Sequence, residues 1–158
     1  MKKFKRILVA NRGEIAIRIF RACKELGIRT VAIYSKEDEK SLFRLKADEA
    51  YLIGENKGPL DAYLNIEEII SLAKKKGVDA IHPGYGFLAE NPEFVKKCKE
   101  AGIVFIGPDE DMMNSLGDKI QSKKVANKAD VATIPGVDKP ITSEKEAVEF
   151  ANQCGYPV

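Results

Sequence analysis

The most chemically distinctive stretch of the sequence runs from His82 to Phe87. It starts at the only histidine of the chain and continues with a proline, two glycines and two aromatic residues. Gly84 and Gly86 permit positive φ angles and the close approach of a ligand, while Tyr85 offers an aromatic face and a hydroxyl group. These residues by themselves fit a tight turn and a ligand-binding loop equally well. His82 is more typical of a satisfied histidine at the end of a buried strand than of a catalytic base.

A second candidate is the turn Ala10–Glu14, which follows the first predicted strand. A dinucleotide-binding fold carries a G-x-G-x-x-G motif at this place, whereas this turn contains Gly13 alone. No acidic residue closes the second predicted strand either. A nicotinamide or flavin dinucleotide site, and with it an oxidoreductase, is therefore disfavoured. Capping of the next helix by Asn11 and a functional role for Arg12 remain equally open.

A third candidate is the segment Leu116–Lys119. Asp118 could cap a helix and leave Lys119 in solvent, or the helix N–H groups and the Lys119 ammonium could bind an anion together. The spacing leaves both interpretations open. No Walker motif, G-x-S-x-G or H-E-x-x-H sequence is present, and one histidine offers no catalytic triad. The residues by themselves thus predict a ligand-binding domain without an assignable reaction.

Strands and helices that alternate along the chain must position these segments. Short apolar and β-branched runs predict strands at residues 6–10, 30–34, 50–53, 79–82 and 104–106. Apolar residues at helical spacing predict helices at residues 14–26, 66–76 and 92–101, with a short one at 41–47. This alternation predicts an α/β fold with a doubly wound, mostly parallel sheet covered by helices on both faces. Because such sheets bind ligands at the carboxyl ends of their strands, position favours a ligand loop after His82.

The character of the sequence changes after residue 108. Residues 109–129 are strongly charged and have a helical pattern, and residues 131–140 contain two prolines and a glycine, which is typical of a loop. A last helix, capped at residue 142 or 143, is expected to bury Ala147, Phe150, Ala151 and Cys154. The final residues Gly-Tyr-Pro-Val resemble the start of a further strand, and we expect the chain to be a piece of a longer protein.

Bulk composition limits the classes of partner. The 158 residues suffice for one compact domain, and 44% hydrophobic with 32% charged residues is typical of a globular protein. A formal charge of +2 is too small to indicate a nucleic-acid or a membrane surface. No apolar run is long enough to span a membrane, and the first residues lack the features of a signal peptide, so we expect a cytoplasmic protein.

Cysteine spacing disfavours metal and disulfide chemistry. Cys23, Cys98 and Cys154 are far apart and form no C-x-x-C pair. Zinc ligation is therefore disfavoured, and a disulfide framework more so. Two of the three fall on apolar faces of predicted helices, which favours buried, reduced thiols.

Several blocks of the sequence together resemble one enzyme family. These blocks are ILVANRGEIAIRIFRACKELGI, KADEAY, YLNIEEII, DAIHPGYGFLAEN, FIGP and LGDK. In this order they resemble the N-terminal part of biotin carboxylases of the ATP-grasp type, over essentially the whole chain. The blocks SLFRLKADEAYLIG and PLDAYLNI are most similar to the pyruvate carboxylase branch, while acetyl- and propionyl-CoA carboxylases share most of the others. The resemblance implies a Rossmann-like pre-ATP-grasp domain over residues 1–108 and a helical linker with a truncated start of an ATP-grasp domain over residues 109–158.

The same resemblance implies an activity for the parent protein. Such enzymes are homo-oligomers that use ATP, Mg²⁺ and bicarbonate to carboxylate biotin on a biotinylated carrier domain. In the pyruvate branch the carboxyl group then passes to pyruvate and gives oxaloacetate. The later ATP-contacting lysine, the glycine-rich lid, the Mg²⁺-binding acidic residues and the catalytic arginine of the family are not in this sequence. We therefore expect no catalytic residue, no metal site, no tightly bound cofactor and no turnover in the 158 residues alone.

The resemblance also implies roles for individual residues. Lys119 corresponds to a lysine that contacts ATP phosphate, where an ammonium offsets charge that develops during phosphoryl transfer. Tyr85, bordered by Gly84 and Gly86, corresponds to the vicinity of the biotin site. The helix arginines near the subunit contact of family dimers are Arg18 and Arg21, and a solvated helix face is the alternative interpretation. A non-catalytic dimerisation module is the remaining rival to an enzyme. Residues 109–158 are expected to be less ordered than the first domain, because their apolar faces lack full cover.

Overall fold

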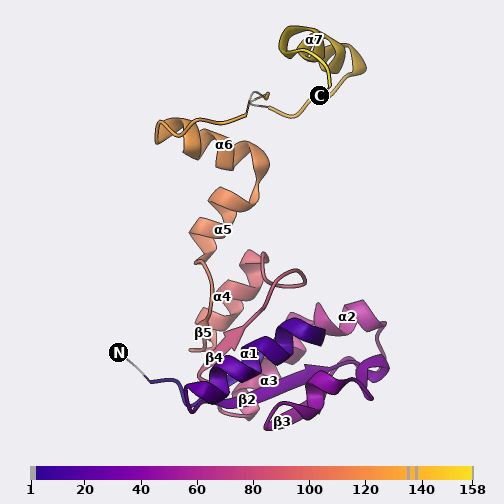
Figure 1. Cartoon of the computed structure of the whole chain (residues 1–158), viewed down its shortest axis with the longest axis vertical. Coiled ribbons are helices and arrows are strands. Elements are labelled where there is room, and N and C mark those ends of the chain that lie inside the picture. The colour runs from indigo at the N-terminus through magenta and orange to yellow at the C-terminus, as the bar shows by residue number, and fades with distance from the viewer. Residues whose placement is uncertain (1–2, 135, 138, 158) are drawn as a thin grey trace. The chain divides into compact units, whose positions relative to one another are not determined.

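The computed structural model describes residues 3–134, 136–137 and 139–157 (Figure 1). The chain divides into two compact units, Met1–Glu110 and Asp111–Val158. The first unit contains the sheet. In the part of the chain that the structure describes, no helix is long and apolar enough to cross a membrane.

A five-stranded sheet with the strand order β3-β2-β1-β4-β5 forms the centre of the first unit. All of its strand pairs are parallel. The strands are β1 (Arg6–Val9), β2 (Arg29–Tyr34), β3 (Glu49–Leu52), β4 (Ala80–His82) and β5 (Val104–Phe105). The prediction of an α/β fold with a doubly wound parallel sheet is confirmed.

The order of the strands creates a topological switch point between β1 and β4. From β1 the chain adds β2 and then β3 on one side, and it returns to add β4 and β5 on the other. The register pairs Val9 with His82, so both strands end at the same level of the sheet. Loops that leave these two ends are therefore neighbours at the edge where doubly wound sheets bind their ligands.

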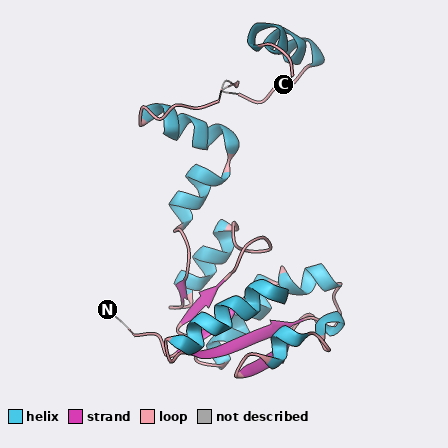
Figure 2. Cartoon of the chain, in the orientation of Figure 1, coloured by secondary structure: helices cyan, strands magenta, loops and turns pink. Residues whose placement is uncertain are grey.

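Helices cover both faces of the sheet, as Figure 2 shows. They are α1 (Gly13–Glu25), α2 (Pro59–Tyr63), α3 (Ile66–Lys75) and α4 (Pro92–Glu100), with 3-10 helices η1 (Lys36–Asp38) and η2 (Leu42–Leu45). Neighbouring residues of a strand point to opposite faces. Ile7 and Val9 of β1 accordingly pack with α1 and η2, whereas Leu8 packs with α3 and α4. Burial on both faces explains why the strands lack polar alternation.

Two local features of the first unit differ from the sequence predictions. The helix α2 was not predicted, because five residues are less than two turns and carry no readable periodicity. It forms because Pro59 starts it and Ala62 and Tyr63 are buried. The short helix predicted at residues 41–47 is the 3-10 helix η2, which buries Phe43.

The last helices are α5 (Glu110–Gly117), α6 (Lys119–Lys128) and α7 (Glu144–Cys154). The helical stretch predicted at residues 109–129 is thus two helices, separated at Asp118. Among the described residues after Glu110, only Met113 and Ala151 are buried. Of the residues predicted to be buried in α7, Ala151 is buried, Ala147 and Phe150 are partly buried, and Cys154 is exposed, because little of α7 has packing partners in the unit.

Candidate functional site

The loops after β1 and β4 form the candidate site. The amide of Ala10 donates to the carbonyl oxygen of His82 at 2.9 Å, which continues the strand pairing to the last residue of β4. Beyond this point the two chains separate into the turn Asn11–Arg12 and the loop Pro83–Phe87. Both lie at the switch point. Gly84, Tyr85 and Gly86, which form the middle of the glycine loop Pro83–Phe87, are therefore at the edge of the sheet where ligands bind in such folds.

Asn11 joins the two loops through its side chain. Asn11 is only 3% exposed. Its Nδ2 donates to the carbonyl oxygens of Pro83 at 2.7 Å and Tyr85 at 2.8 Å. Its Oδ1 accepts the amide of Arg12 at 2.9 Å. The proposed capping role of Asn11 is wrong: Arg12 occupies the N-cap position of α1, and no side chain caps it. The side-chain amide of Asn11 instead donates to the loop after β4, which is distant in the sequence.

The loop after β4 has a backbone that side chains rarely permit. Gly84, Gly86 and Phe87 have φ angles of 68°, 65° and 45°. A Cβ atom on Gly84 would lie 2.7 Å from Nδ2 and 3.0 Å from Cγ of Asn11, whereas one on Gly86 would meet nothing within 4 Å. Gly84 is therefore required both by its backbone conformation and by the close approach of Asn11.

His82 holds the start of this loop. Its Nδ1 accepts the amide of Gly84 at 3.0 Å. Burial lowers the pKa of His82, so the imidazole is neutral at pH 7 and Nδ1 is available as an acceptor. His82 is the last residue of β4, and the contact of Nδ1 within the loop favours the interpretation of His82 as a structural histidine at a strand end.

Tyr85 presents its ring at the surface of the site. The residue is 60% exposed, and its hydroxyl group donates to Oε1 of Glu14 at 2.7 Å. This hydrogen bond raises the pKa of Tyr85, because it stabilises the protonated phenol. Tyr85 therefore reaches the first turn of α1, where its aromatic face is open to a ligand.

A buried carboxylate lies beside these loops, at the end of β2. Asp38 is 4% exposed, and Arg12 donates to both of its oxygens, from Nε at 2.6 Å and from the terminal nitrogen at 2.7 Å. The hydroxyl groups of Tyr63 and Ser41 each donate to it at 2.8 Å. Burial by itself raises the pKa of Asp38, but the hydrogen bonds from its donors outweigh this, and the pKa lies below its ordinary value. The bidentate pair in turn raises the pKa of Arg12.

The carboxylate network reaches the glycine loop through an aromatic contact. The rings of Tyr63 and Phe87 stack with their centroids 5.2 Å apart. Burial and the hydrogen bond to Asp38 raise the pKa of Tyr63, which stays a neutral phenol. Sequence reasoning missed Asp38 and Tyr63. Their signal is weak, because each lies in a helix too short for periodicity and their contact depends on tertiary packing.

The other predicted site residues lie apart from the glycine loop. Arg18 and Arg21 are exposed on α1 and line a surface depression of about 250 Å³ with Ala22 and Glu25. Nε of Arg21 donates to Oε1 of Glu25 at 3.0 Å, one helical turn away. Such an exposed pair contributes little to stability and leaves both arginines available to a partner.

Lys119 is the first residue of α6, in the second unit. The Asp118 carboxylate accepts the amides of Ile120 at 3.0 Å and Gln121 at 2.8 Å, so the capping interpretation of Asp118 is confirmed. Two of the N–H groups at this helix start are thereby occupied. Anion binding here would therefore depend on the exposed Lys119 ammonium.

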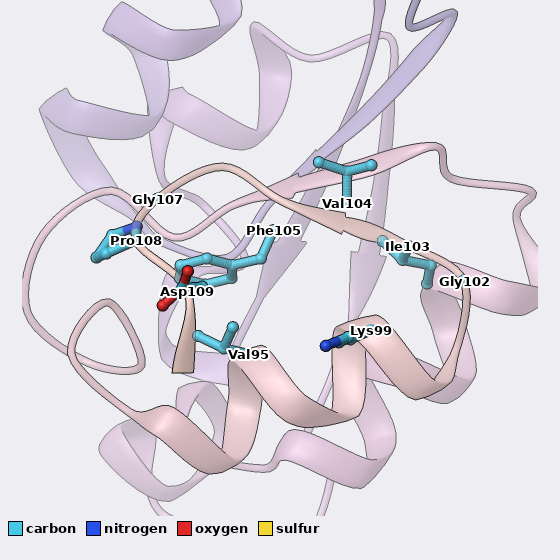
Figure 3. Close-up of a pocket in the computed structure, with 9 residues that line it drawn as sticks. All are labelled: Val95, Lys99, Gly102, Ile103, Val104, Phe105, Gly107, Pro108 and Asp109. Carbon is cyan, nitrogen blue, oxygen red and sulfur yellow. The ribbon is translucent and has the colours of Figure 1, made fainter. Parts of the chain in front are cut away.

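An apolar cavity lies at the β5 edge of the sheet, away from the glycine loop. It measures about 310 Å³ and is lined by α4, β5 and the residues on either side of β5 (Figure 3). Its walls are mainly apolar, with Val95, Ile103, Val104 and Phe105 among them. It shares no lining residue with the site at the switch point. Within the described ranges, no group of three or more His, Cys, Asp or Glu side chains could hold a metal ion.

Comparison with known families decides what kind of domain carries this loop. Residues 3–113 match the family described as biotin carboxylase, N-terminal domain. The chain belongs to this family. Residues 118–158 match a second family, described as the ATP binding domain of the carbamoyl-phosphate synthase L chain. The resemblance carried by the sequence blocks is confirmed.

The similar proteins include whole carboxylases much longer than this chain. Pyruvate carboxylase of Staphylococcus aureus (strain Mu50) is 58% identical over the full chain, which covers 14% of that protein. Mitochondrial pyruvate carboxylase of Homo sapiens is 55% identical over 99% of the chain and 13% of the relative. The solved biotin carboxylase domain dimer of Hydrogenobacter thermophilus 2-oxoglutarate carboxylase, in complex with MgADP, ADP and bicarbonate, is 53% identical with a TM-score of 0.92. The match covers 99% of this chain and 34% of that one.

Proposed function

We propose that the chain is the N-terminal part of the biotin carboxylase region of a pyruvate carboxylase. Such an enzyme uses MgATP and bicarbonate to carboxylate biotin on a carrier domain, and then transfers the carboxyl group to pyruvate to give oxaloacetate. The observation that carries the proposal is the 58% identity to a pyruvate carboxylase along all 158 residues. The proposal includes a cytoplasmic enzyme, although the human and mouse relatives are mitochondrial.

We propose that the two compact units correspond to two domains of the parent enzyme. Residues 1–108 form the pre-ATP-grasp domain and residues 109–158 the start of the ATP-grasp domain. The separation of the units after Glu110 and the family matches to residues 3–113 and 118–158 support this division.

Tyr85 is proposed to face the biotin side of the active region. Its support is positional: the residue is exposed on a loop at the switch point, where doubly wound sheets bind ligands. Gly84 and Gly86 keep the backbone on either side of it free of side chains. An aromatic face beside bare backbone suits a flat, uncharged ring system such as the ureido ring of biotin.

Lys119 is proposed to contact the phosphate groups of ATP. Its exposed ammonium stands at the start of α6, where Asp118 already caps the helix, so the ammonium is the group left to contact phosphate. Such a group stabilises negative charge that develops on the phosphoryl oxygens during transfer. The solved relative with MgADP and bicarbonate supports a nucleotide and a bicarbonate ion as ligands of the parent enzyme.

Arg18 and Arg21 are proposed to lie at a subunit contact of a homo-oligomer. Both are exposed on α1, and the solved 2-oxoglutarate carboxylase relative is a domain dimer. Sedimentation of Arg21→Glu in the whole enzyme tests this. A weaker dimer supports the contact, and an unchanged one assigns Arg21 to a solvated face.

The activity is tested first on the chain alone, and then in a hybrid enzyme. The 158 residues by themselves should show no bicarbonate-dependent ATP cleavage with free biotin, and turnover above a blank would contradict the proposal. In the hybrid, this chain replaces the matching N-terminal segment of the Staphylococcus aureus enzyme. Restored, bicarbonate-dependent ATP cleavage supports the proposal, and a folded but inactive hybrid argues against it.

Single variants of the hybrid separate the two proposed contacts. Lys119→Gln should raise the KM for ATP by about ten-fold or more, as expected for loss of a charged contact to phosphate. Lys124→Gln on the same helix is the matched control, because it removes an exposed ammonium farther from the helix start. Equal effects of the two variants would remove Lys119 from the nucleotide site. Tyr85→Ala should instead raise the KM for free biotin.

A further inference from the structure

The side chain of Asn11 is placed to determine the shape of a loop 72 residues farther along the chain. It is buried, and its Nδ2 spans the carbonyl oxygens of Pro83 and Tyr85, on either side of Gly84. We propose that Asn11 is the positioning residue of the His82–Phe87 loop and so determines where Tyr85 stands. The consequence for biotin binding rests on the function proposed above.

The chemistry of the contact requires a short amide. Two donors on one nitrogen serve two carbonyl oxygens, while Oδ1 accepts the amide of Arg12 from its own turn. Aspartate has the same shape but no donor when ionised, and serine has a single donor. Glutamine has the amide on a longer stem, for which the contact with Gly84 leaves no space: a single Cβ added there would already lie 2.7 Å from Nδ2.

The loop depends on this contact because its own backbone bonding is sparse. Pro83 has no N–H group. The amide of Gly84 donates to a side chain, at Nδ1 of His82. Ala89 donates to Gly86 at the far end of the loop. Gly84 and Gly86 adopt positive φ angles without strain, but Phe87 has a φ of 45°, a conformation that a bulky residue keeps only when surrounding contacts hold it.

Tyr85 is held at two points, and Asn11 provides the buried one. Its carbonyl oxygen accepts from Asn11, and its hydroxyl group donates to Glu14 at the surface. A hydrogen bond between exposed groups competes with water and restricts the ring weakly. The buried amide contact therefore sets the backbone from which the tyrosine ring projects.

The first experiment uses the 158-residue chain and measures amide hydrogen exchange and ¹H–¹⁵N chemical shifts. Asn11→Asp should speed exchange of the Gly84 and Ala89 amides by about ten-fold or more, as expected when buried carbonyl groups lose their donors. The matched control is Thr30→Val, which removes a buried hydroxyl that bonds Asp48 at the start of β2. Loop amides that stay unchanged in Asn11→Asp, or that respond equally to Thr30→Val, overturn the proposal.

The pH dependence of the loop chemical shifts separates a donor role of Asn11 from a role that only fills space. Protonation of the new carboxyl group restores one donor, so the loop shifts of Asn11→Asp should move toward those of the wild type as pH falls. Asn11→Ala should not recover. Glu14, His82 and the Arg12–Asp38 pair are ionisable groups beside the loop, so the pH dependence of the wild-type shifts is subtracted. Absence of recovery in the aspartate variant counts against the donor role.

A second variant keeps the test valid if substitutions at Asn11 prevent folding. In Gly84→Ala the added methyl group collides with the side-chain amide of Asn11 from the loop side, and it should speed exchange of the Ala89 amide in the same way.

The hybrid enzyme then separates this inference from the proposed function. Asn11→Asp should raise the KM for free biotin about ten-fold while changing the KM for ATP by less than about two-fold. A displaced loop with unchanged biotin kinetics overturns the biotin role of Tyr85 and leaves the positioning role intact. An undisplaced loop overturns the positioning role whatever the kinetics.

Discussion

Two glycines in one loop should respond very differently to the same substitution. Gly84 and Gly86 have φ angles of 68° and 65°, so alanine at either position adopts a left-handed conformation that costs about 1–2 kcal/mol. A Cβ on Gly86 meets nothing within 4 Å. A Cβ on Gly84 lies 2.7 Å from Nδ2 and 3.0 Å from Cγ of Asn11, and overpacking of this kind costs about 1–3 kcal/mol more. Asn11 cannot swing away cheaply, because Nδ2 is held by two carbonyl oxygens.

Urea unfolding of the chain followed by circular dichroism measures this difference. With an m-value of about 2 kcal/mol per molar, Gly84→Ala should unfold at about 0.5–1.5 M less urea than Gly86→Ala. A double-mutant cycle locates the cause, because Asn11→Ala removes the nearest contacting atoms and should erase most of the difference. Equal midpoints for the two alanine variants would refute the reasoning. So would a difference that persists in full after Asn11 is truncated.

Three further predictions concern charge, thiols and local stability. Although burial opposes it, hydrogen bonding holds the pKa of Asp38 below its ordinary value, so its stabilisation is present above about pH 3.9 and is lost as pH falls through the native pKa. Asp38→Asn should therefore cost about 1–3 kcal/mol at pH 6 and less at pH 3 in urea titrations, and an equal cost at both would contradict this. Burial raises the pKa of the Cys98 thiol to about 12 and also raises that of Cys23. In native protein a thiol reagent should modify the exposed Cys154 first, and modification of all three at one rate would argue against the packing. Hydrogen exchange should be faster in the described residues after Glu110 than in the sheet, because few of those side chains are buried, and equal protection would exclude this.

Much of the fold could be predicted from local patterns. The run TVAIY and the helical spacing of Ile66, Ile69, Ile70 and Ala73 depend on neighbours within two turns, and the structure has β2 and α3 at these places. A parallel sheet was predictable because its strands are buried on both faces and so lack polar alternation. The helix α2 was not predictable in this way. Its five residues are helical because Tyr63 stacks on Phe87 and donates a hydrogen bond to Asp38, and these contacts join segments that are separate in the sequence.

The glycine loop shows where local reasoning ends. The types of its residues already indicated a turn or loop with bare backbone and an aromatic side chain, since glycine permits positive φ angles and proline fixes φ without any partner. Asn11, by contrast, has the local pattern of a helix cap, and its actual bonds join it to Pro83 and Tyr85, 72 and 74 residues away. Only the register of β1 against β4, which sets Val9 opposite His82, brings these groups within hydrogen-bonding distance. Residue chemistry is a property of each side chain and can be recognised along the chain, whereas a donor finds its acceptor only when the folded sheet places them together.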